Sequence, residues 1–276
     1  MDIPNELRGA FARRPVDASK YSVGTVAVIG GSERYPHAPV IAALGARSGG
    51  AGLVQLVVPD ASRYAAGAHV PEATFTALTA TCVPPRADVT IVGMGLGVSE
   101  ASEELVARLL SGEGRRFVLD ADALTILASW RRRKAVPDFA AGREIVLTPH
   151  EGEAARLLDW TREAVAADRP RAVREIAGLY GATVALKGAH TLVASVDGSR
   201  VYENATGNPF MALGGMGDLL AGVIGARWAS LQTDAFLATS SGVWLHGLAS
   251  DEVVKTATDP SIVNTAARIG SLRVRL

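Results

Sequence analysis

Residues 207–222 read GNPFMALGGMGDLLAG, where Gly214, Gly215 and Gly217 precede Asp218 and an apolar run without helix breakers. This pattern predicts a helix N-terminus that approaches an anion, because glycine lets backbone N–H groups come close to a ligand and the helix dipole favours negative charge. A carboxylate repels phosphate, so Asp218 makes better sense as a base for a hydroxyl that attacks the phosphate. The alternative is a tight turn with Asp218 near a helix N-cap.

Before this segment, short apolar runs alternate with helical patterns. The runs cover residues 26–29, 53–58, 89–92, 117–119, 145–147, 183–186 and 191–195. Helices are expected over about 39–48 and 100–110, after the runs ending at 119 and 147, and from the glycine segment to the chain end, with a break near Asp259-Pro260. This alternation predicts an α/β fold with a mostly parallel sheet and helices on both faces. In such sheets, ligands bind at the carboxyl ends of the strands. We expect one domain over residues 1–276, with residues 1–20 as an N-terminal extension.

The composition is that of an ordinary enzyme in a reducing compartment. Lys and Arg total 28, as do Asp and Glu, so no global basic field argues for nucleic acid as a partner. The single cysteine, Cys82, excludes an internal disulfide framework. Early polar residues argue against a signal peptide, and no apolar run is long enough to span a membrane. We therefore expect a cytoplasmic protein with no membrane partner.

Several common catalytic motifs are absent from the sequence. The glycine turns at residues 30–31 and 93–97 lack the GxGxxG spacing of a dinucleotide-binding turn, and no GxxxxGK[ST], GxSxG or HExxH segment occurs. The five histidines lack metal-ligand spacing, so no protein metal cage is expected.

Polar residues at strand ends are the candidates for a binding site. His150 follows a strand together with Thr148, and we interpret it as a ligand contact, although a lone histidine is often structural. Asp120 and Asp122 could bind a ribose or water-coordinated Mg²⁺, or Asp122 could cap the next helix. Lys187 is a candidate phosphate cation, with an exposed loop lysine as the alternative.

Taken in order, these segments resemble the ribokinase-like superfamily, and within it the ADP- or ATP-dependent NAD(P)H-hydrate dehydratases. The resemblance runs from about Lys20 to Gly225. It is carried by VIGGS at 28–32 with Tyr35, GMGLG at 93–97, LDADAL at 119–124, LTPHEGE at 147–153, LKG at 186–188, TGNPxMA at 206–212 and GGMGD at 214–218. The combination of the LTPHEGE and TGNPxMA segments is more specific than any one motif.

The resemblance implies a three-layer α/β/α ribokinase-like fold and repair of hydrated NADH and NADPH. Such enzymes use ADP or ATP with Mg²⁺ to phosphorylate the ring hydroxyl, after which phosphate leaves. By position, Asp218 would be the base and would contact the substrate. The other implied roles are an anion hole of Gly214, Gly215 and Gly217; nucleotide binding by Lys187, Gly188, Ala189, His190, Thr191, Asn208 and Gly217; and substrate binding by Ala38, Gly95, Gly97 and His150. Mg²⁺ would be held mainly by water and phosphate oxygens.

Three positions depart from the usual family pattern. Phe210 stands where glycine is frequent, Thr125 where asparagine is common, and Pro36-His37 where a Thr-Gly-like pair is usual. The epimerase domain of fused relatives is absent, so a separate epimerase is expected to act on the same substrate pool. We also expect a homo-oligomer, in which the alanine-rich helix after Pro39 could pack against a partner.

Two other functions fit the glycine segment. A kinase of a small alcohol, such as a thiamin-precursor or pyridoxal-type kinase, would share the fold and the Gly-x-Gly-Asp element. A nucleotide sensor without turnover would need the glycine turns but not the base.

Overall fold

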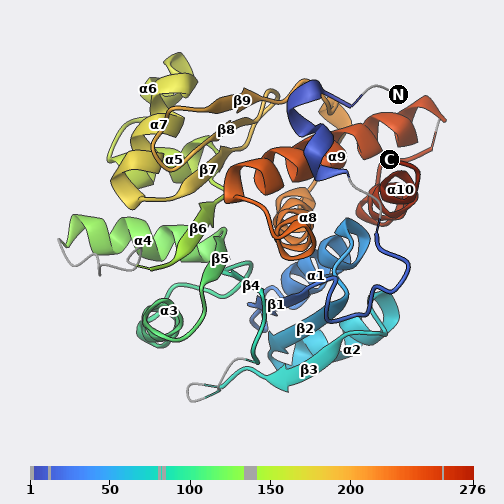
Figure 1. The fold of residues 1–276 in the computed structure, drawn as a ribbon. Helices are drawn as coiled ribbons and strands as arrows, with labels where there is room; N and C mark the ends of the chain where they lie inside the picture. The colour runs from blue at the N-terminus through green and yellow to red at the C-terminus, as the bar shows by residue number, and fades with distance from the viewer. Residues whose placement is uncertain (1–2, 12–13, 80–81, 83–84, 134–141, 257) are drawn as a thin grey trace.

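The computed structural model describes residues 3–11, 14–79, 82, 85–133, 142–256 and 258–276. Nine strands form one sheet in the order β3-β2-β1-β4-β5-β6-β7-β8-β9 (Figure 1). Pairing is parallel from β3 to β7, and β8 and β9 add an antiparallel edge. The strands are β1 (Thr25–Ile29), β2 (Leu53–Val58), β3 (Thr74–Ala77), β4 (Val89–Val92), β5 (Arg116–Leu119), β6 (Glu144–Leu147), β7 (Thr183–Leu186), β8 (Leu192–Ala194) and β9 (Val201–Glu203).

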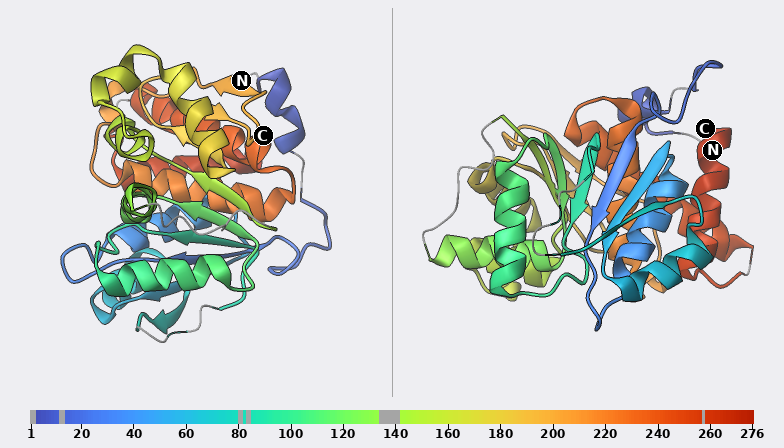
Figure 2. Two further views of the ribbon diagram at one scale, coloured as in Figure 1. Left: turned by 90° about the vertical axis from the view of Figure 1, so that its left-hand side faces the viewer. Right: turned by 90° about the horizontal axis from the view of Figure 1, so that it is seen from below.

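Helices cover both faces of this sheet, which makes three layers. Figure 1 shows one layer with α3 (Glu100–Ser111), α4 (Asp122–Arg132), α5 (Glu151–Leu158) and α7 (Arg169–Tyr180), and the short α6 (Arg162–Ala167) beside them. The opposite layer holds α1 (Ala38–Gly49), α2 (Asp60–His69), α8 (Met216–Leu231), α9 (Ala235–Lys255) and α10 (Ile262–Arg275). The 3₁₀ turn η1 (Asn5–Ala10) packs on α9, as both views of Figure 2 show, and η2 (Pro209–Met211) precedes α8.

The sheet separates two apolar clusters. Val26 and Val28 of β1 pack with α1 and α8, whereas Ile29 packs with the α3–α7 layer, because successive side chains of a strand point to opposite faces. The central strands are buried on both faces, which explains why they read as continuous apolar runs.

Helix α8 lies against α1 with backbone touching backbone. A Cβ atom on Gly222 would overlap the carbonyl oxygen of Ala42, and one on Gly45 would overlap the carbonyl oxygen of Leu219. Only glycine allows two helices to come this close. The start of α8 is therefore fixed relative to α1 and, through α1, to the sheet.

The α/β class and the mostly parallel sheet are confirmed. The helix expected over 39–48 is α1, and the helix expected over 100–110 is α3, which Ser99 caps by accepting a hydrogen bond from the N–H of Ser102. The sequence reading missed α2, β3, α6, α7 and β9. Of these, β3 is a short edge strand without buried residues, so it lacks the apolar pattern that marks the central strands. Among the described residues, no helix is both long and apolar enough to cross a bilayer.

Candidate active site

The ends of β5, β6 and β7 bring three charged side chains together. Lys187, directly after β7, places its Nζ 2.7 Å from Oδ1 of Asp120, which follows β5, and 3.8 Å from Oε2 of Glu153 in the first turn of α5. Asp120 is 1% exposed and Glu153 6%, while the Lys187 side chain is 18% exposed. The alternative of an exposed loop lysine is therefore wrong, because Lys187 belongs to a nearly buried ionic cluster.

His150 joins this cluster as the N-cap of α5. Its Nδ1 accepts hydrogen bonds from the N–H groups of Gly152 and Glu153 at 3.0 and 3.2 Å, and Oε2 of Glu153 accepts one from the N–H of His150 at 2.8 Å. Burial, and then the positive charge of Lys187, lower the pKa of His150 below its usual value. The ring is therefore neutral at pH 7, with its proton on Nε2. His150 has a structural role as a cap, and its ring stands beside the charged cluster.

The N-terminus of α8 reaches the same place. Gly215 is its N-cap, with a φ of 93° that glycine adopts readily. Within the described ranges, no acceptor contacts the N–H groups of Gly214, Gly215, Gly217 or Asp218. A Cβ on Gly217 would lie 3.3 Å from Nζ of Lys187, so the lysine ammonium stands beside the helix start. Free N–H groups, the helix dipole and a cation together form an anion-binding arrangement.

Asp218 lies in the first turn of α8, where burial and neighbouring carboxylates favour its protonated form. Burial, and then the negative charge of Asp120, raise its pKa to about 7, against the opposing effect of Lys187. Burial also raises the pKa of Glu153, which Lys187 opposes. Burial alone would lower the pKa of Lys187, but Asp120 and Glu153 raise it overall, so the lysine stays charged. The cluster thus combines a fixed cation with a carboxyl group that can exchange a proton near neutral pH.

The glycine turn after β4 contacts Asp120, because a Cβ on Gly93 would overlap the carbonyl oxygen of Asp120. The N–H of Gly97 donates to Oδ2 of Asp122 at 2.7 Å. The suggestion that Asp122 caps its helix is therefore wrong: α4 starts at Asp122 itself, and the carboxylate instead holds the turn. Gly95 packs closely on Ala38, since a Cβ on Gly95 would lie 3.1 Å from that of Ala38. The two predicted substrate contacts, Gly95 and Ala38, are neighbours.

Helix α9 holds the segment that precedes η2 and α8. Asp251 accepts hydrogen bonds from the N–H of Gly207 and from Nδ2 of Asn208, both at 2.9 Å. The exposed side chain of Phe210 follows in η2, with 62% of its surface accessible. The sequence reading missed Asp251, because it lies within a long helix and forms no local motif with Asn208.

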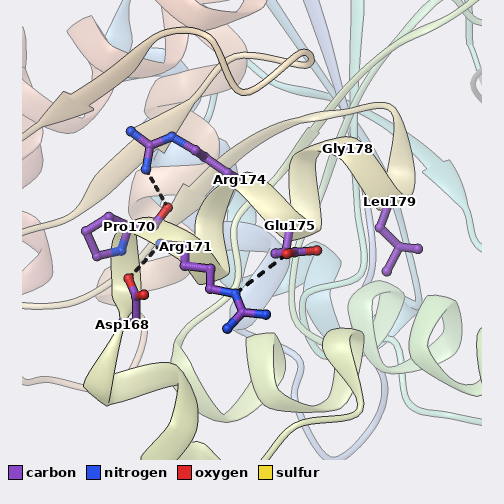
Figure 3. Close-up of a pocket in the computed structure, with 7 residues that line it drawn as sticks. All are labelled: Asp168, Pro170, Arg171, Arg174, Glu175, Gly178 and Leu179. Carbon is purple, nitrogen blue, oxygen red and sulfur yellow. Dashed lines mark hydrogen bonds and ion pairs between the residues drawn. The ribbon is translucent and has the colours of Figure 1, made fainter.

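The remaining predicted nucleotide contacts form a loop after β7. Thr191 Oγ1 donates to the carbonyl oxygen of Gly188 at 3.2 Å, which closes the loop. Nδ1 of His190 lies 3.7 Å from Oε1 of Glu203 in β9. The open hollow in Figure 3 lies elsewhere, along α7, and includes the exposed pair Arg171–Glu175. None of the residues at the strand ends lines this hollow. The candidate active site is therefore located from the charged residues at the strand ends and not from the hollow.

Comparison with known proteins identifies the family. The sequence profile of the NAD(P)H-hydrate dehydratase family matches residues 26–269. The chain belongs to this family. The family resemblance seen in the sequence is thereby confirmed.

Two curated members illustrate the relationship. The ADP-dependent (S)-NAD(P)H-hydrate dehydratase of Neisseria meningitidis serogroup B is 41% identical over 252 residues, which cover 90% of this chain and 83% of that protein. A bifunctional NAD(P)H-hydrate repair enzyme of Gloeobacter violaceus is 37% identical over 90% of this chain. The chain spans 49% of the length of that bifunctional protein.

Solved structures confirm the ribokinase-like fold. The ADP/ATP-dependent NAD(P)H-hydrate dehydratase of Bacillus subtilis, co-crystallized with ATP and Mg²⁺, matches with a TM-score of 0.83 and 25% identity, covering 97% of this chain and 96% of that one. A hydroxyethylthiazole kinase of Pyrococcus horikoshii OT3 matches with a TM-score of 0.61 and 18% identity, over 99% of this chain and 92% of that one. The kinase shares the fold, whereas the dehydratases share both fold and sequence, which favours the dehydratase over the small-alcohol kinase.

Proposed function

We propose that this protein restores NADH and NADPH from their hydrated forms, using ADP or ATP to phosphorylate the ring hydroxyl before phosphate leaves. Membership of the dehydratase family supports the reaction class. The observation that carries the assignment to this site is the meeting of Lys187, Asp218 and the unpaired N–H groups of α8 at one edge of the sheet.

In this proposal, Asp218 takes the proton from the substrate hydroxyl while the hydroxyl oxygen bonds to the terminal phosphorus of the nucleotide. The bond from that phosphorus to the leaving AMP or ADP breaks as the new bond forms. Its pKa, raised to about 7, lets Asp218 exchange a proton near neutral pH, and its ionised form can accept the proton of the hydroxyl. The N–H groups of Gly214, Gly215 and Gly217, with the ammonium of Lys187, stabilise the negative charge on the transferred group.

The other site residues position the two ligands. Loop 187–191 and Asn208 are proposed to hold the nucleotide, since Lys187 stands beside Gly217 and Asn208 precedes the glycine segment in the chain. Ala38, Gly95, Gly97 and His150 are proposed to hold the hydrated cofactor. The contact between Gly95 and Ala38, and the Asp122 hydrogen bond that fixes Gly97, support a single preformed surface there.

The residues present fit a magnesium ion held mainly by phosphates. No group of three or more His, Cys, Asp or Glu residues in the described ranges could hold a metal ion, and Asp120 is already paired with Lys187. Mg²⁺ typically keeps several waters and binds substrate phosphates with few protein ligands. When bound, it would neutralise charge on the phosphates, while this chain positions them.

The wider biological setting forms part of the same proposal. We propose one catalytic domain over residues 1–276, a cytoplasmic location and assembly into a homo-oligomer. We also propose that a separate epimerase acts on the same substrate pool. The relatives that are named bifunctional NAD(P)H-hydrate repair enzymes support a second activity in the repair of the same substrates.

The test uses purified protein, hydrated NADH or NADPH, Mg²⁺ and either ADP or ATP. We expect the absorbance of the reduced nicotinamide to return, and Asp218→Asn to lose at least a hundredfold in turnover while still binding nucleotide. No return of absorbance would refute the proposal. A stable phosphate ester of a vitamin alcohol would indicate the small-alcohol kinase instead. Nucleotide binding without any turnover would indicate a sensor.

A further inference from the structure

Arg169, the first residue of α7, makes an unusual set of contacts beneath loop 187–191. Its Nη1 donates to Oε1 of Glu151 at 2.6 Å. Its Nη2 lies within hydrogen-bond distance of three carbonyl oxygens, those of Leu186, Lys187 and His190, at 3.1, 3.5 and 3.2 Å. One guanidinium therefore joins the loop after β7 to the start of α5, and its side chain is only 19% exposed.

The loop is shaped around this guanidinium. A Cβ atom on Gly188 would lie 2.6–2.9 Å from Nη2, Nη1 and Cζ of Arg169, so a larger residue there would displace the guanidinium from its present position. The planar fork of arginine suits this task, because it presents several donors in fixed directions, whereas lysine offers a compact point charge.

Two N–H groups of the loop have partners: that of Lys187 donates to the carbonyl oxygen of Pro149, and that of Gly188 to Oγ1 of Thr191. Within the described ranges, no acceptor contacts the N–H groups of Ala189 and His190. Carbonyl oxygens facing a phosphate would repel it, whereas successive free N–H groups attract anions. By binding the carbonyl oxygens of Leu186, Lys187 and His190, Arg169 holds the loop in the conformation in which the N–H groups of Ala189 and His190 stay unpaired.

We propose that Arg169 is a positioning residue for the nucleotide: it holds loop 187–191 so that the N–H groups of Ala189 and His190 bind a nucleotide phosphate. This inference rests on the proposed function, in which the same loop contacts ADP or ATP. Arg169 itself acts only through the loop.

The experiment measures Mg²⁺–ADP and Mg²⁺–ATP binding to the full chain by calorimetry, without hydrated cofactor. We expect Arg169→Gln to raise the Kd roughly ten- to a hundredfold, because a charged donor to several backbone acceptors is lost. Arg169→Lys should lie between this variant and the wild type. The matched control is Arg174→Gln on the same helix, an exposed arginine that donates to the carbonyl of Pro170 (Figure 3). Its Kd should stay within about twofold of wild type.

Turnover separates positioning from a merely structural role. We expect Arg169→Gln to raise the KM for nucleotide and leave the KM for hydrated cofactor unchanged. If Arg169 had only a structural role, Arg169→Gln would lower the fraction of active enzyme and leave both KM values unchanged. That result would overturn the inference. A folded Arg169→Gln variant with the wild-type Kd for nucleotide would also overturn it. If Arg169→Gln fails to fold, Glu151→Gln decides: a severalfold rise in Kd supports the inference, and a wild-type Kd overturns it.

Binding without dehydration would refute the proposed function and leave the role of Arg169 intact. A wild-type protein that binds no adenine nucleotide would overturn both.

Discussion

Replacing Asp218 by asparagine should stabilise the folded protein at alkaline pH, because the site holds this carboxylate at an energetic cost. Its pKa is about 7 in the folded protein, and about 3.9 is the ordinary value that applies when the chain is unfolded. Folding therefore disfavours the ionised form. The cost is absent below about pH 4, grows as the pH rises, and is complete above about pH 7. Each unit of difference between the folded and unfolded pKa corresponds to about 1.4 kcal/mol, so the full cost of ionising Asp218 in the folded protein is about 4 kcal/mol.

The assay is urea unfolding of the wild type and Asp218→Asn at pH 5 and pH 8. The stability gained by the variant should be larger at pH 8 than at pH 5 by about 2–3 kcal/mol. The exposed Asp17 provides the matched control, because Asp17→Asn makes the same substitution at a side chain that lies in solvent. If the gain from Asp218→Asn is the same at both pH values, the carboxylate is not penalised by the fold and the reasoning fails.

Two further substitutions test the cation and the helix contact. Lys187→Met leaves Asp120 buried without its partner and should cost about 3–5 kcal/mol in urea unfolding. It also removes a charge that lowers the pKa of Asp218, so the acid limb of the kcat/KM profile should move to higher pH; an unchanged limb would contradict this. Gly222→Ala places a Cβ against the carbonyl of Ala42 and should cost about 1–3 kcal/mol and reduce kcat by shifting α8. In thermal unfolding, Gly270→Ala, which meets open space on α10, should instead stabilise by about 0.5–1 kcal/mol; equal effects would contradict the packing argument.

Local chemistry made the central fold predictable. The run 53–58 is β2 in the structure, because a strand buried on both faces must be apolar along its length. The edge elements β3 and β9 escaped prediction, because they are short and partly exposed. Helix α2 is only weakly apolar, with Ser62 and Ala66 as its buried residues, so it carries little periodic signal.

The location of the site was also predictable, since parallel strands present their carboxyl ends at one edge. Asp120, His150 and Lys187 meet there as expected. The hydrogen bonds that hold the loops around these residues could not be predicted from the sequence. Asp122 could have capped α4 on sequence grounds, and only the tertiary structure shows that it holds Gly97. Arg169 follows Asp168 at an ordinary helix start, and nothing local indicates that it reaches across to loop 187–191.

The glycine contact between α1 and α8 has a consequence for how the site can diverge among relatives. A contact between two backbones has no rotamers, so neighbouring side chains cannot repack to move the start of α8. The position of the start of α8 relative to α1 is therefore nearly fixed. Variation in substrate preference must then arise in the flanking segments. Within residues 207–213, Gly207 and Asn208 are held by Asp251, so the exposed Phe210 is the residue there that a substitution can change without disturbing the backbone.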